Sequence, residues 1–526
     1  MKSLFKLLEK NKATTSLFEK KGSFVVDDTL GVALLIASAF KKKPEKYTLI
    51  TTNLYNAQRL YDLLAGFLGE EACLFFPVDE ILRAESIATS KEMLSQRLFV
   101  MDALSDPTPR ILITHASGLM RFLPDPALFL SKTLSFEVGK EYNLQSVFKV
   151  LSESGYNRVN KIDQSLQFAV RGDILDIYSV NLSSPVRIEF FGDEVESIRF
   201  FDIATQGSTG ETKSIKILPA SDILLTTDEE HVLKDKIENR LTLDKDVVGD
   251  EKYETIAQKT RNDYQRLLDR QYHSSLYKYM GFAEEKHFSI LDYCGSTTIF
   301  ICNFPQFKEA ARMITEEATD YFSEMFEEGQ MMSHLAMYQD PMRVLTNFSP
   351  VIFGHELIEK DNDISFSVRP IIGSANNLAN AQRLIESYCN SDEKVIIALS
   401  NKQQIDSVVH LLKEANIEFS MVEGMNLPDG KLGICLLSLE EGFELVDEKI
   451  AYLTSKEIFG FRNRISRFLN RFKEATILKS YEDLEPGDYV VHENNGIGQF
   501  LDITTLEVDG VHRDFLHIAY AGTDVL

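Results

Sequence analysis

The sequence lacks the side-chain patterns that enzymes and metal proteins place at their reactive centres. Its five cysteines, at positions 73, 294, 302, 389 and 435, form no CxxC pair and no cluster with histidine. The motifs HExxH and GxSxG are also absent. We therefore expect no disulfide framework, no metal site, no catalytic residue and no bound cofactor in this stretch, and we expect a reducing compartment.

A nucleotide-binding loop is missing as well. A P-loop needs the pattern GxxxxGK[ST], because backbone amides, the lysine and the hydroxyl all act on phosphates and Mg²⁺. The apolar strand Phe24–Val26 precedes a helical pattern, where such a loop would stand, but residues 27–31 read DDTLG. One glycine, no lysine and two carboxylates that would repel phosphate argue against ATP binding at this point.

The chain also lacks an excess of basic residues. The chain carries 56 Lys and Arg against 80 Asp and Glu, a net charge of −24, which excludes a basic footprint over the whole surface. The longest apolar stretch, Leu30 to Phe40, is about half a membrane span and predicts a buried helix. Residues 1–12 do not resemble a signal peptide, so we expect a cytoplasmic protein without membrane contact.

With 526 residues, the chain is long enough for three or four domains. We predict a multidomain α/β protein: a parallel α/β domain interrupted by a mainly antiparallel β insertion, a small second α/β domain, and a small C-terminal β-barrel that is incomplete. Leu291–Tyr293 is expected to be a short strand of the first domain. The expected segments are 1–135 (first domain), 136–219 (insertion), 220–345 (first domain, continued), 346–364 (linker), 365–460 (second α/β domain), 461–480 (basic helical linker) and 481–526 (barrel).

One strand of the insertion carries a binding signal. Alternation along Val186–Phe191 places Arg187, Glu189 and Phe191 on the face opposite the apolar residues. Arginine beside an exposed aromatic ring is typical of a binding hot spot, and Arg171 of a nearby strand could join the same patch. The alternative is that Phe191 packs under the Gly192-Asp193 turn while the arginines form ion pairs at the rim. The pattern alone leaves both open.

Two further segments carry weaker signals. Arg464, Arg467 and Arg471 share one face of the predicted helix 461–473. This face could contact phosphate or another domain, or it could be the solvated side of a connector. The strand-like stretch from 481 onward could bind a partner by edge-strand addition, or it could be a self-contained barrel.

The same C-terminal stretch resembles the RNA-polymerase-interaction domain of the bacterial transcription-repair coupling factors, the Mfd family. Residues 487–521 contain the family's GDYVVH, GIG and TTLE patterns. Further matches follow in order along nearly the whole chain. They are FPVDE at 76–80 with SQRL at 95–98, RGDILD at 171–176, RIEFFGDE at 187–194 and EIFG at 457–460. The pair RGDILD and RIEFFGDE also resembles the domain by which UvrB docks onto UvrA.

The resemblance implies a UvrB-like first domain that has lost its P-loop. It further implies that Arg171, Arg187 and Phe191 contact UvrA. Thr505 and Leu506 would lie near the contact with the RNA polymerase β subunit. In the family an ATP-driven double-stranded DNA translocase follows, so ATP, Mg²⁺ and most DNA contacts are expected outside these residues.

The sequence therefore predicts the adaptor half of a transcription-repair coupling factor, active in transcription-coupled nucleotide-excision repair. Two alternatives remain at this point. One is a divergent nucleotide hydrolase of the UvrB type, which the degenerate sequence at 27–31 disfavours. The other is a stand-alone UvrA-binding protein without a role at the polymerase.

Overall fold

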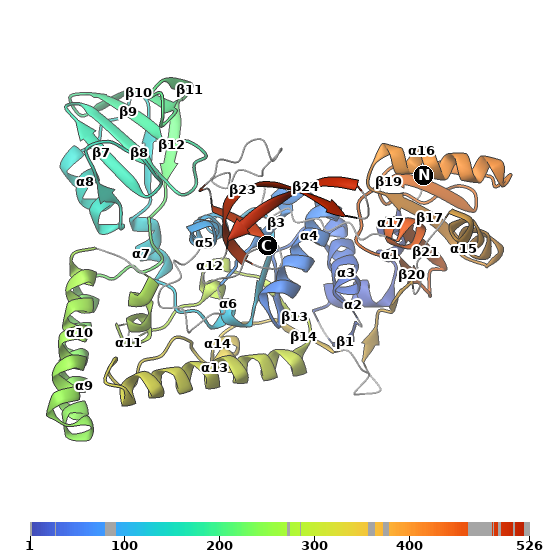
Figure 1. The fold of residues 1–526 in the computed structure, drawn as a ribbon. Helices are drawn as coiled ribbons and strands as arrows, with labels where there is room; N and C mark the ends of the chain where they lie inside the picture. The colour runs from blue at the N-terminus through green and yellow to red at the C-terminus, as the bar shows by residue number, and fades with distance from the viewer. Residues whose placement is uncertain are drawn as a thin grey trace. The chain divides into compact units, whose positions relative to one another are not determined.

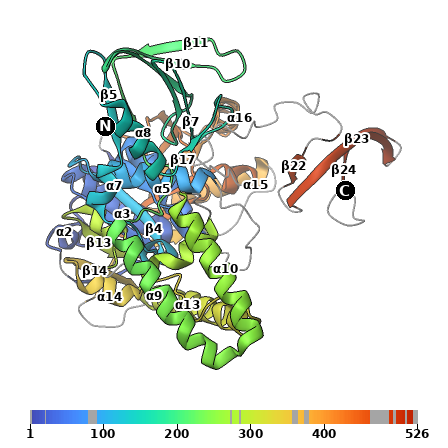
Figure 2. The same ribbon diagram turned by 90° about the vertical axis from the view of Figure 1, so that its left-hand side faces the viewer.

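The computed structural model describes residues 3–519 except 21, 27, 79–90, 271–273, 284–285, 356–362, 372–377, 461–486, 488, 493–495 and 509–510. The chain divides into two compact units, Met1–Phe468 and Leu469–Leu526. Figures 1 and 2 show the elements of both units from two directions.

The first domain is built on a parallel sheet of seven strands in the order β15-β1-β14-β13-β2-β4-β3. All residues of β2 and β4 are buried, as expected when helices cover both faces of a parallel sheet. Three of the strands follow the insertion in sequence, so the domain is formed by two separate stretches of chain. The strands are β1 (Ser23–Val25), β2 (Tyr47–Thr51), β3 (Cys73–Phe75), β4 (Ile111–His115), β13 (Thr298–Ile301), β14 (Val351–His355) and β15 (Ile364–Ser365).

Strand β14 pairs with β1 and β13. It lies within the expected linker 346–364 and covers Val351–Phe353, which the sequence also indicates as a short strand. One element of this domain differs from the sequence-based expectation. Leu291–Tyr293, expected to be a strand, belongs to helix α12 (Ile290–Cys294). The reason for the helix is local: Ser289 and Asp292 form a reciprocal capping box, in which Asp292 accepts a hydrogen bond from the Ser289 amide at 2.7 Å.

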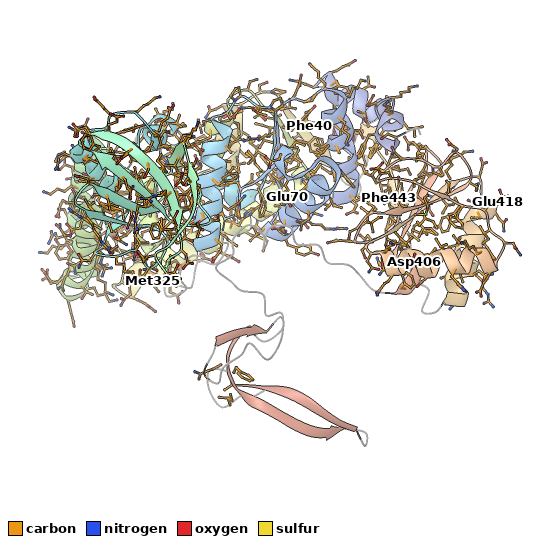
Figure 3. All side chains as sticks on the ribbon, turned by 90° about the horizontal axis from the view of Figure 1, so that it is seen from above. Phe40, Glu70, Met325, Asp406, Glu418 and Phe443 are labelled. Carbon is orange, nitrogen blue, oxygen red and sulfur yellow. The ribbon has the colours of Figure 1, made fainter. Side chains whose placement is uncertain are left out.

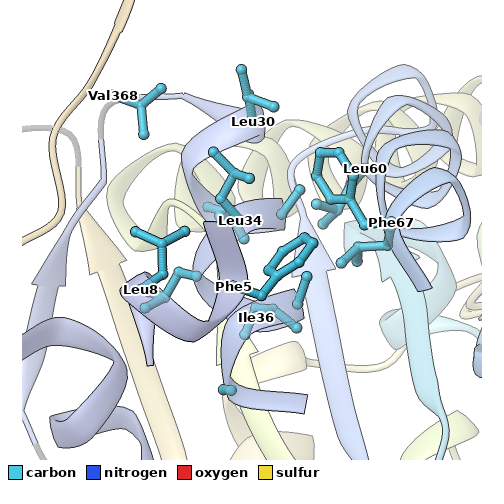
Figure 4. Packing of buried hydrophobic residues seen from close by; sticks show 14 of the residues in the cluster. Phe5, Leu8, Leu30, Leu34, Ile36, Leu60, Phe67 and Val368 are labelled. Atoms are coloured by element: carbon cyan, nitrogen blue, oxygen red, sulfur yellow. The ribbon is translucent and has the colours of Figure 1, made fainter. Parts of the chain in front are cut away.

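Helices cover both faces of the first sheet. On one face α3 (Thr29–Lys42) is buried along most of its length, which confirms the helix expected from the apolar run at 30–40. Its side chains pack with α1 (Leu4–Leu8), α2 (Lys12–Phe18) and α4 (Leu54–Leu68) (Figure 4). The opposite face is covered by α6 (Ala116–Met120), α12, α13 (Phe304–Glu327) and α14 (Pro341–Thr346).

The insertion is a mainly antiparallel sheet of six strands, ordered β11-β10-β9-β8-β7-β6, with only β6 and β7 parallel. A short two-stranded sheet and helix α8 (Leu144–Glu153) pack against its inner face. The strands are β5 (Leu134–Glu137), β6 (Asn157–Arg158), β7 (Gln167–Arg171), β8 (Ile174–Tyr178), β9 (Val186–Phe191), β10 (Glu194–Phe201), β11 (Ser208–Thr212) and β12 (Ser214–Ile217).

A buried ion cluster ties the end of the insertion to the first domain. The Asp222 carboxylate accepts hydrogen bonds from Arg97 Nε at 2.9 Å and Arg121 Nε at 3.1 Å. Arg97 belongs to the SQRL motif on α5 (Lys91–Leu104), and its side chain is 2 % exposed. The Arg121 guanidinium stacks on the Tyr277 ring at 3.8 Å. The two arginines hold the pKa of Asp222 at about 2, against the cost of burying its carboxylate.

The segment after the insertion is helical, as the sequence predicts. Helices α9 (Thr227–Val248) and α10 (Asp250–Leu268) form a hairpin. They pack with the turn η2 (Ser274–Tyr279), α11 (Met280–Ala283) and the far end of α13 (Figure 2). The core of this helical segment consists of apolar and aromatic side chains and is separate from the core around the first sheet.

The second α/β domain has a mixed sheet ordered β16-β20-β21-β17-β19-β18, with Phe443 of β20 and Asp406 of α16 marked in Figure 3. One face of this sheet shares a continuous core with α1 and α3 of the first domain. The elements are β16 (Val368–Pro370), α15 (Leu378–Asn390), β17 (Lys394–Leu399), α16 (Lys402–Glu414), β18 (Ser420–Met421), β19 (Leu432–Leu436), β20 (Phe443–Leu445), β21 (Ile450–Thr454) and α17 (Ser455–Phe459).

The second unit contains an antiparallel sheet of three strands, β22 (Tyr489–His492), β23 (Gly496–Val508) and β24 (Val511–Ala519). These strands do not close into a barrel over the described residues, so the barrel stays a prediction. Arg464, Arg467 and Arg471 lie outside the described residues.

Candidate functional site: the outer face of the insertion sheet

The strand β9 separates its side chains onto two faces, as the alternation predicts. Val186, Ile188 and Phe190 are buried in the insertion core. The three intervening residues lie on the opposite surface, which we call the outer face. It is formed by β7–β10 and carries Arg171, Ile174, Asp176, Arg187, Glu189, Phe191 and Arg199.

Phe191 is the most exposed large apolar residue described, with 81 % of its surface accessible. It ends β9 and pairs with Glu194 across a two-residue turn, in which Gly192 has φ of 66°. A positive φ favours glycine in such a hairpin. The ring therefore does not pack under the turn, so that part of the alternative is wrong, whereas Arg187 does form an ion pair.

Arg187 is held in place by a buried carboxylate. Its Nε and Nη2 atoms donate to the two oxygens of Asp176 at 2.7 and 2.9 Å. Asp176 stands opposite Arg187 on β8 and is 3 % exposed. The guanidinium also lies 4.6 Å from the centre of the Phe201 ring. The hydrogen bonds that Arg187 donates to Asp176 raise the pKa of Arg187, so this arginine is a fixed, permanently charged group with 22 % of its side chain exposed.

A second ion pair lies between Arg187 and Phe191 along the face. Glu189 accepts from Ser197 Oγ at 2.8 Å and is paired with Arg199 on β10. The hydrogen bond from Ser197 and the charge of Arg199 lower the pKa of Glu189. Because both partners are only partly buried, this pair orders the face more than it stabilises the fold.

Arg171 lies at the exposed end of β7 on the same face. The register runs from Arg171 to Ile174 and from Ile174 to Glu189, so Arg171 and Glu189 are two strands apart. Its guanidinium donates twice to the Asn160 carbonyl, at 3.1 and 2.7 Å. The structure thus places all three sequence-predicted residues on one face, with Arg171 at its margin.

Sequence reasoning missed Asp176 and Arg199. The alternation of β8 buries Leu175 and Ile177 in the core and turns Asp176 to the outer face. This alternation could have identified Asp176 as a residue of that face. The pairing of Asp176 with Arg187 depends on the β8–β9 register, and the intervening residues 179–185 do not fix that register.

For the second predicted site, the structure describes only backbone. Thr505 pairs with Asp514 and Leu506 with Arg513, both on β24. Strand β22 pairs with residues 496–499 of β23. Among the described strands, residues 501–508 of β23 therefore have a pairing partner on one side only.

The position expected for a nucleotide loop holds the protein's own charges. The carboxylate of Asp28 caps α3 by accepting from the Thr29 amide at 2.6 Å. Arg59 of α4 pairs with Asp28 at 3.3 Å and with Glu441 of the second α/β domain at 2.6 Å. A helix N-terminus attracts anions, and here a carboxylate takes that place. The described residues contain no metal-ligand cluster, and none of their helices is long and apolar enough to cross a bilayer.

Comparison with known proteins connects both predicted sites to domain families. Residues 134–222 match the family described as "UvrB interaction domain". Residues 484–526 match the family described as "CarD-like/TRCF RID domain". The first match covers the whole outer face, and the second covers the three-stranded sheet.

Curated relatives match along nearly the whole chain. A transcription-repair-coupling factor of Bacillus subtilis (strain 168) is 30 % identical over 493 residues, covering 91 % of this chain and 42 % of that protein. One of Staphylococcus haemolyticus (strain JCSC1435) is 27 % identical over 511 residues, covering 94 % and 43 %. The chain thus spans less than half the length of these relatives. With this coverage and both domain matches in place, the chain is similar to the transcription-repair-coupling factors along nearly its whole length and spans less than half of theirs.

Proposed function

We propose that this chain is an adaptor in transcription-coupled nucleotide-excision repair. Its outer face would bind UvrA, and its C-terminal sheet would bind the β subunit of a stalled RNA polymerase. Double-stranded DNA would be bound mainly by the translocase segment that the family resemblance implies, which would also be the part that uses ATP and Mg²⁺. We assign no catalytic step to the residues of this chain, and we expect the protein to act in the cytoplasm.

The observation that carries the proposal is the exposed ring of Phe191 beside the fixed guanidinium of Arg187. A ring left 81 % exposed beside an arginine supplies two side-chain types that are enriched at protein interfaces, and arginine is also enriched at binding hot spots. Because Asp176 already orients Arg187, this side chain would lose little conformational entropy on binding. The position of both residues within the UvrB interaction domain supports UvrA as the partner.

The polymerase assignment is supported by the strand pairing. A strand with one open edge offers backbone donors and acceptors to an added strand, and residues 501–508 of β23 are such a segment among the described residues. Thr505 and Leu506 lie within it, in a region that matches the CarD-like/TRCF RID family.

Phe191→Ala is the sharpest test of the UvrA assignment. We expect the variant to bind purified UvrA about thirtyfold more weakly, corresponding to about 2 kcal/mol for loss of a hot-spot ring. The thermal unfolding of the chain should stay unchanged, because the ring is exposed. Affinity can be measured by calorimetry or surface-based binding. Tyr55→Ala is the matched control, since Tyr55 is an aromatic residue 73 % exposed on α4 of the first domain.

Arg187→Ala is less suited to this test, because it would leave the Asp176 carboxylate buried without its partner. Equal affinity of Phe191→Ala and the unaltered chain for UvrA would contradict the proposal, as would an equal loss of affinity in Tyr55→Ala.

A further inference from the structure

A cationic depression lies on the helical part of the first unit, and its lining residues are not those of the outer face. It has a volume of about 730 Å³ and is bounded by α10, the turn η2 and residues 330–331, with Gly155 and Asn157 of the insertion at its rim. This volume is within the range of ligand sites. Its lining is mostly polar and charged, however, so it does not suit an apolar ligand.

Four cations line the depression: Lys259, Arg266, Arg270 and Lys278. The only carboxylate of the lining residues is Asp263. Such a grouping stands out in a chain with a net charge of −24. Since salt screens exposed charges beyond about 8 Å at physiological ionic strength, an anion in the depression would respond to these side chains more than to the net charge.

The carboxylate in the depression is already neutralised. Asp263 accepts a hydrogen bond from the Tyr279 hydroxyl at 3.1 Å and pairs with Lys278 at 3.0 Å. The side chains of Lys278 and Asp263 are 11 % and 15 % exposed. Because Asp263 is partly buried and paired with Lys278, it does not present a free negative charge to a ligand.

The remaining cations are arranged differently. Arg266 is 58 % exposed and stands 3.8 Å from Asp263, beyond hydrogen-bond distance. Lys259 is exposed and contacts a neutral partner, Gln330. Arg270 is paired with Glu230. Lys259 and Arg266 are thus the most exposed of the four cations, and they contact the neutral Gln330 and the already paired Asp263, respectively.

The spacing of these cations selects for an extended ligand. Lys259 and Arg266 are seven residues apart on α10, and therefore lie on one face about 10 Å apart along the helix axis. Phosphates of one DNA strand follow each other at about 3.4 Å along the duplex axis. The two side chains can therefore contact different phosphates of one backbone, whereas a single phosphate ion would reach only one of them.

We propose that this depression binds phosphate groups of a nucleic-acid backbone, with Lys259 and Arg266 as the contacting residues. The guanidinium of Arg266 offers paired donors that match a phosphate, and Asn262 and Ser275 add polar groups to the lining. This site is separate from the outer face and does not rest on the assignment of UvrA or RNA polymerase as partners.

The test compares DNA binding by the 526-residue chain and by the double variant Lys259→Ala/Arg266→Ala. Fluorescence anisotropy of a short labelled duplex is measured between about 50 and 200 mM salt. We expect the variant to bind more weakly at every salt concentration. The slope of log affinity against log salt should fall by about two, because each phosphate contact contributes about 0.9.

The matched control is Lys308→Ala/Arg312→Ala, which removes two exposed cations from α13. It should leave the slope and the affinity unchanged. Thermal unfolding of both double variants should match that of the unaltered chain, since all four side chains are exposed.

Three results would overturn the proposal. The first is equal slopes for the unaltered chain and the Lys259→Ala/Arg266→Ala variant. The second is binding of inorganic pyrophosphate without binding of the duplex. The third is binding of an acidic peptide without binding of the duplex.

Discussion

Asp176 and Asp222 are both aspartates with 3 % of their surface exposed, and both are paired with arginine. They differ in where the arginine lies. Asp222 holds Arg97, whose side chain is 2 % exposed, inside the junction between the insertion and the first domain. Asp176 holds Arg187 at the surface, with 22 % of its side chain accessible. The same chemistry therefore serves to join two parts of the fold in one place and to present a charged group in the other.

The position of the apolar neighbours explains the difference. Arg121, the second partner of Asp222, is covered by the Tyr277 ring, so no charge of the cluster is available to a partner protein. At the outer face the ring of Phe201 lies against Arg187, while Phe191 at the end of the same strand is exposed. A buried ion pair thus contributes to the protein surface only where one of its members reaches solvent.

The largest effect should come from breaking the Asp222 cluster. Asp222→Ala removes the buried carboxylate that Arg97 and Arg121 share, and we expect it to lower the free energy of unfolding by about 3–5 kcal/mol. Urea unfolding monitored by circular dichroism measures this. Asp222→Asn is the control at the same position, because its amide oxygen still accepts one hydrogen bond and the loss should be smaller. A loss below about 0.5 kcal/mol in Asp222→Ala would contradict this role.

A somewhat smaller effect is expected at the outer face. Arg187→Ala should destabilise the insertion by about 3 kcal/mol, at the lower end for a broken buried pair because Arg187 is partly solvated. Hydrogen exchange of strands β7–β10 reports on this part of the chain directly. Adding Asp176→Asn removes the unpaired charge, so the double variant should be more stable than Arg187→Ala alone. Additive losses would mean that the two side chains do not act as a pair.

The dependence of stability on pH should be the smallest of the three effects and should belong to Asp222. Its pKa is lowered from 3.8 to about 2 in the folded chain. A carboxylate with a depressed pKa contributes its stability above the unfolded pKa and loses it as the pH falls through the folded pKa. We therefore expect about 2 kcal/mol to be lost between about pH 4 and pH 2. Urea midpoints across this range should fall less in Asp222→Asn than in the unaltered chain.

The sequence alone predicted those features of the site that depend on strand periodicity. Alternation placed Arg187 and Phe191 on one face, because side chains of a strand alternate irrespective of their surroundings. It did not decide whether the ring of Phe191 is covered, since that depends on what packs beyond the turn. Nor did it pair Asp176 with Arg187, because partners on neighbouring strands are set by register.

For the fold, too, the sequence predicted the features that depend on local periodicity. The alternation of strands and helices predicted the parallel sheet, and the apolar run at 30–40 predicted helix α3. The error at Leu291–Tyr293 arose because three apolar residues fit a strand and a helix equally well. The capping pair Ser289 and Asp292 was the local signal that distinguishes the two. The shared core of the two α/β domains joins residues too distant in sequence for periodicity to connect.

That shared core has a consequence for synthesis on the ribosome. The Leu4 amide donates to the Met425 carbonyl at 2.9 Å, and the Asn11 side chain donates to Glu448 at 2.8 Å. At about 5–20 residues per second, these partners emerge roughly 20–90 s after the first helices. During that interval the apolar sides of α1 and α3 that later meet the second sheet have no native cover. The nascent chain therefore keeps these apolar side chains exposed until the second α/β domain has been translated.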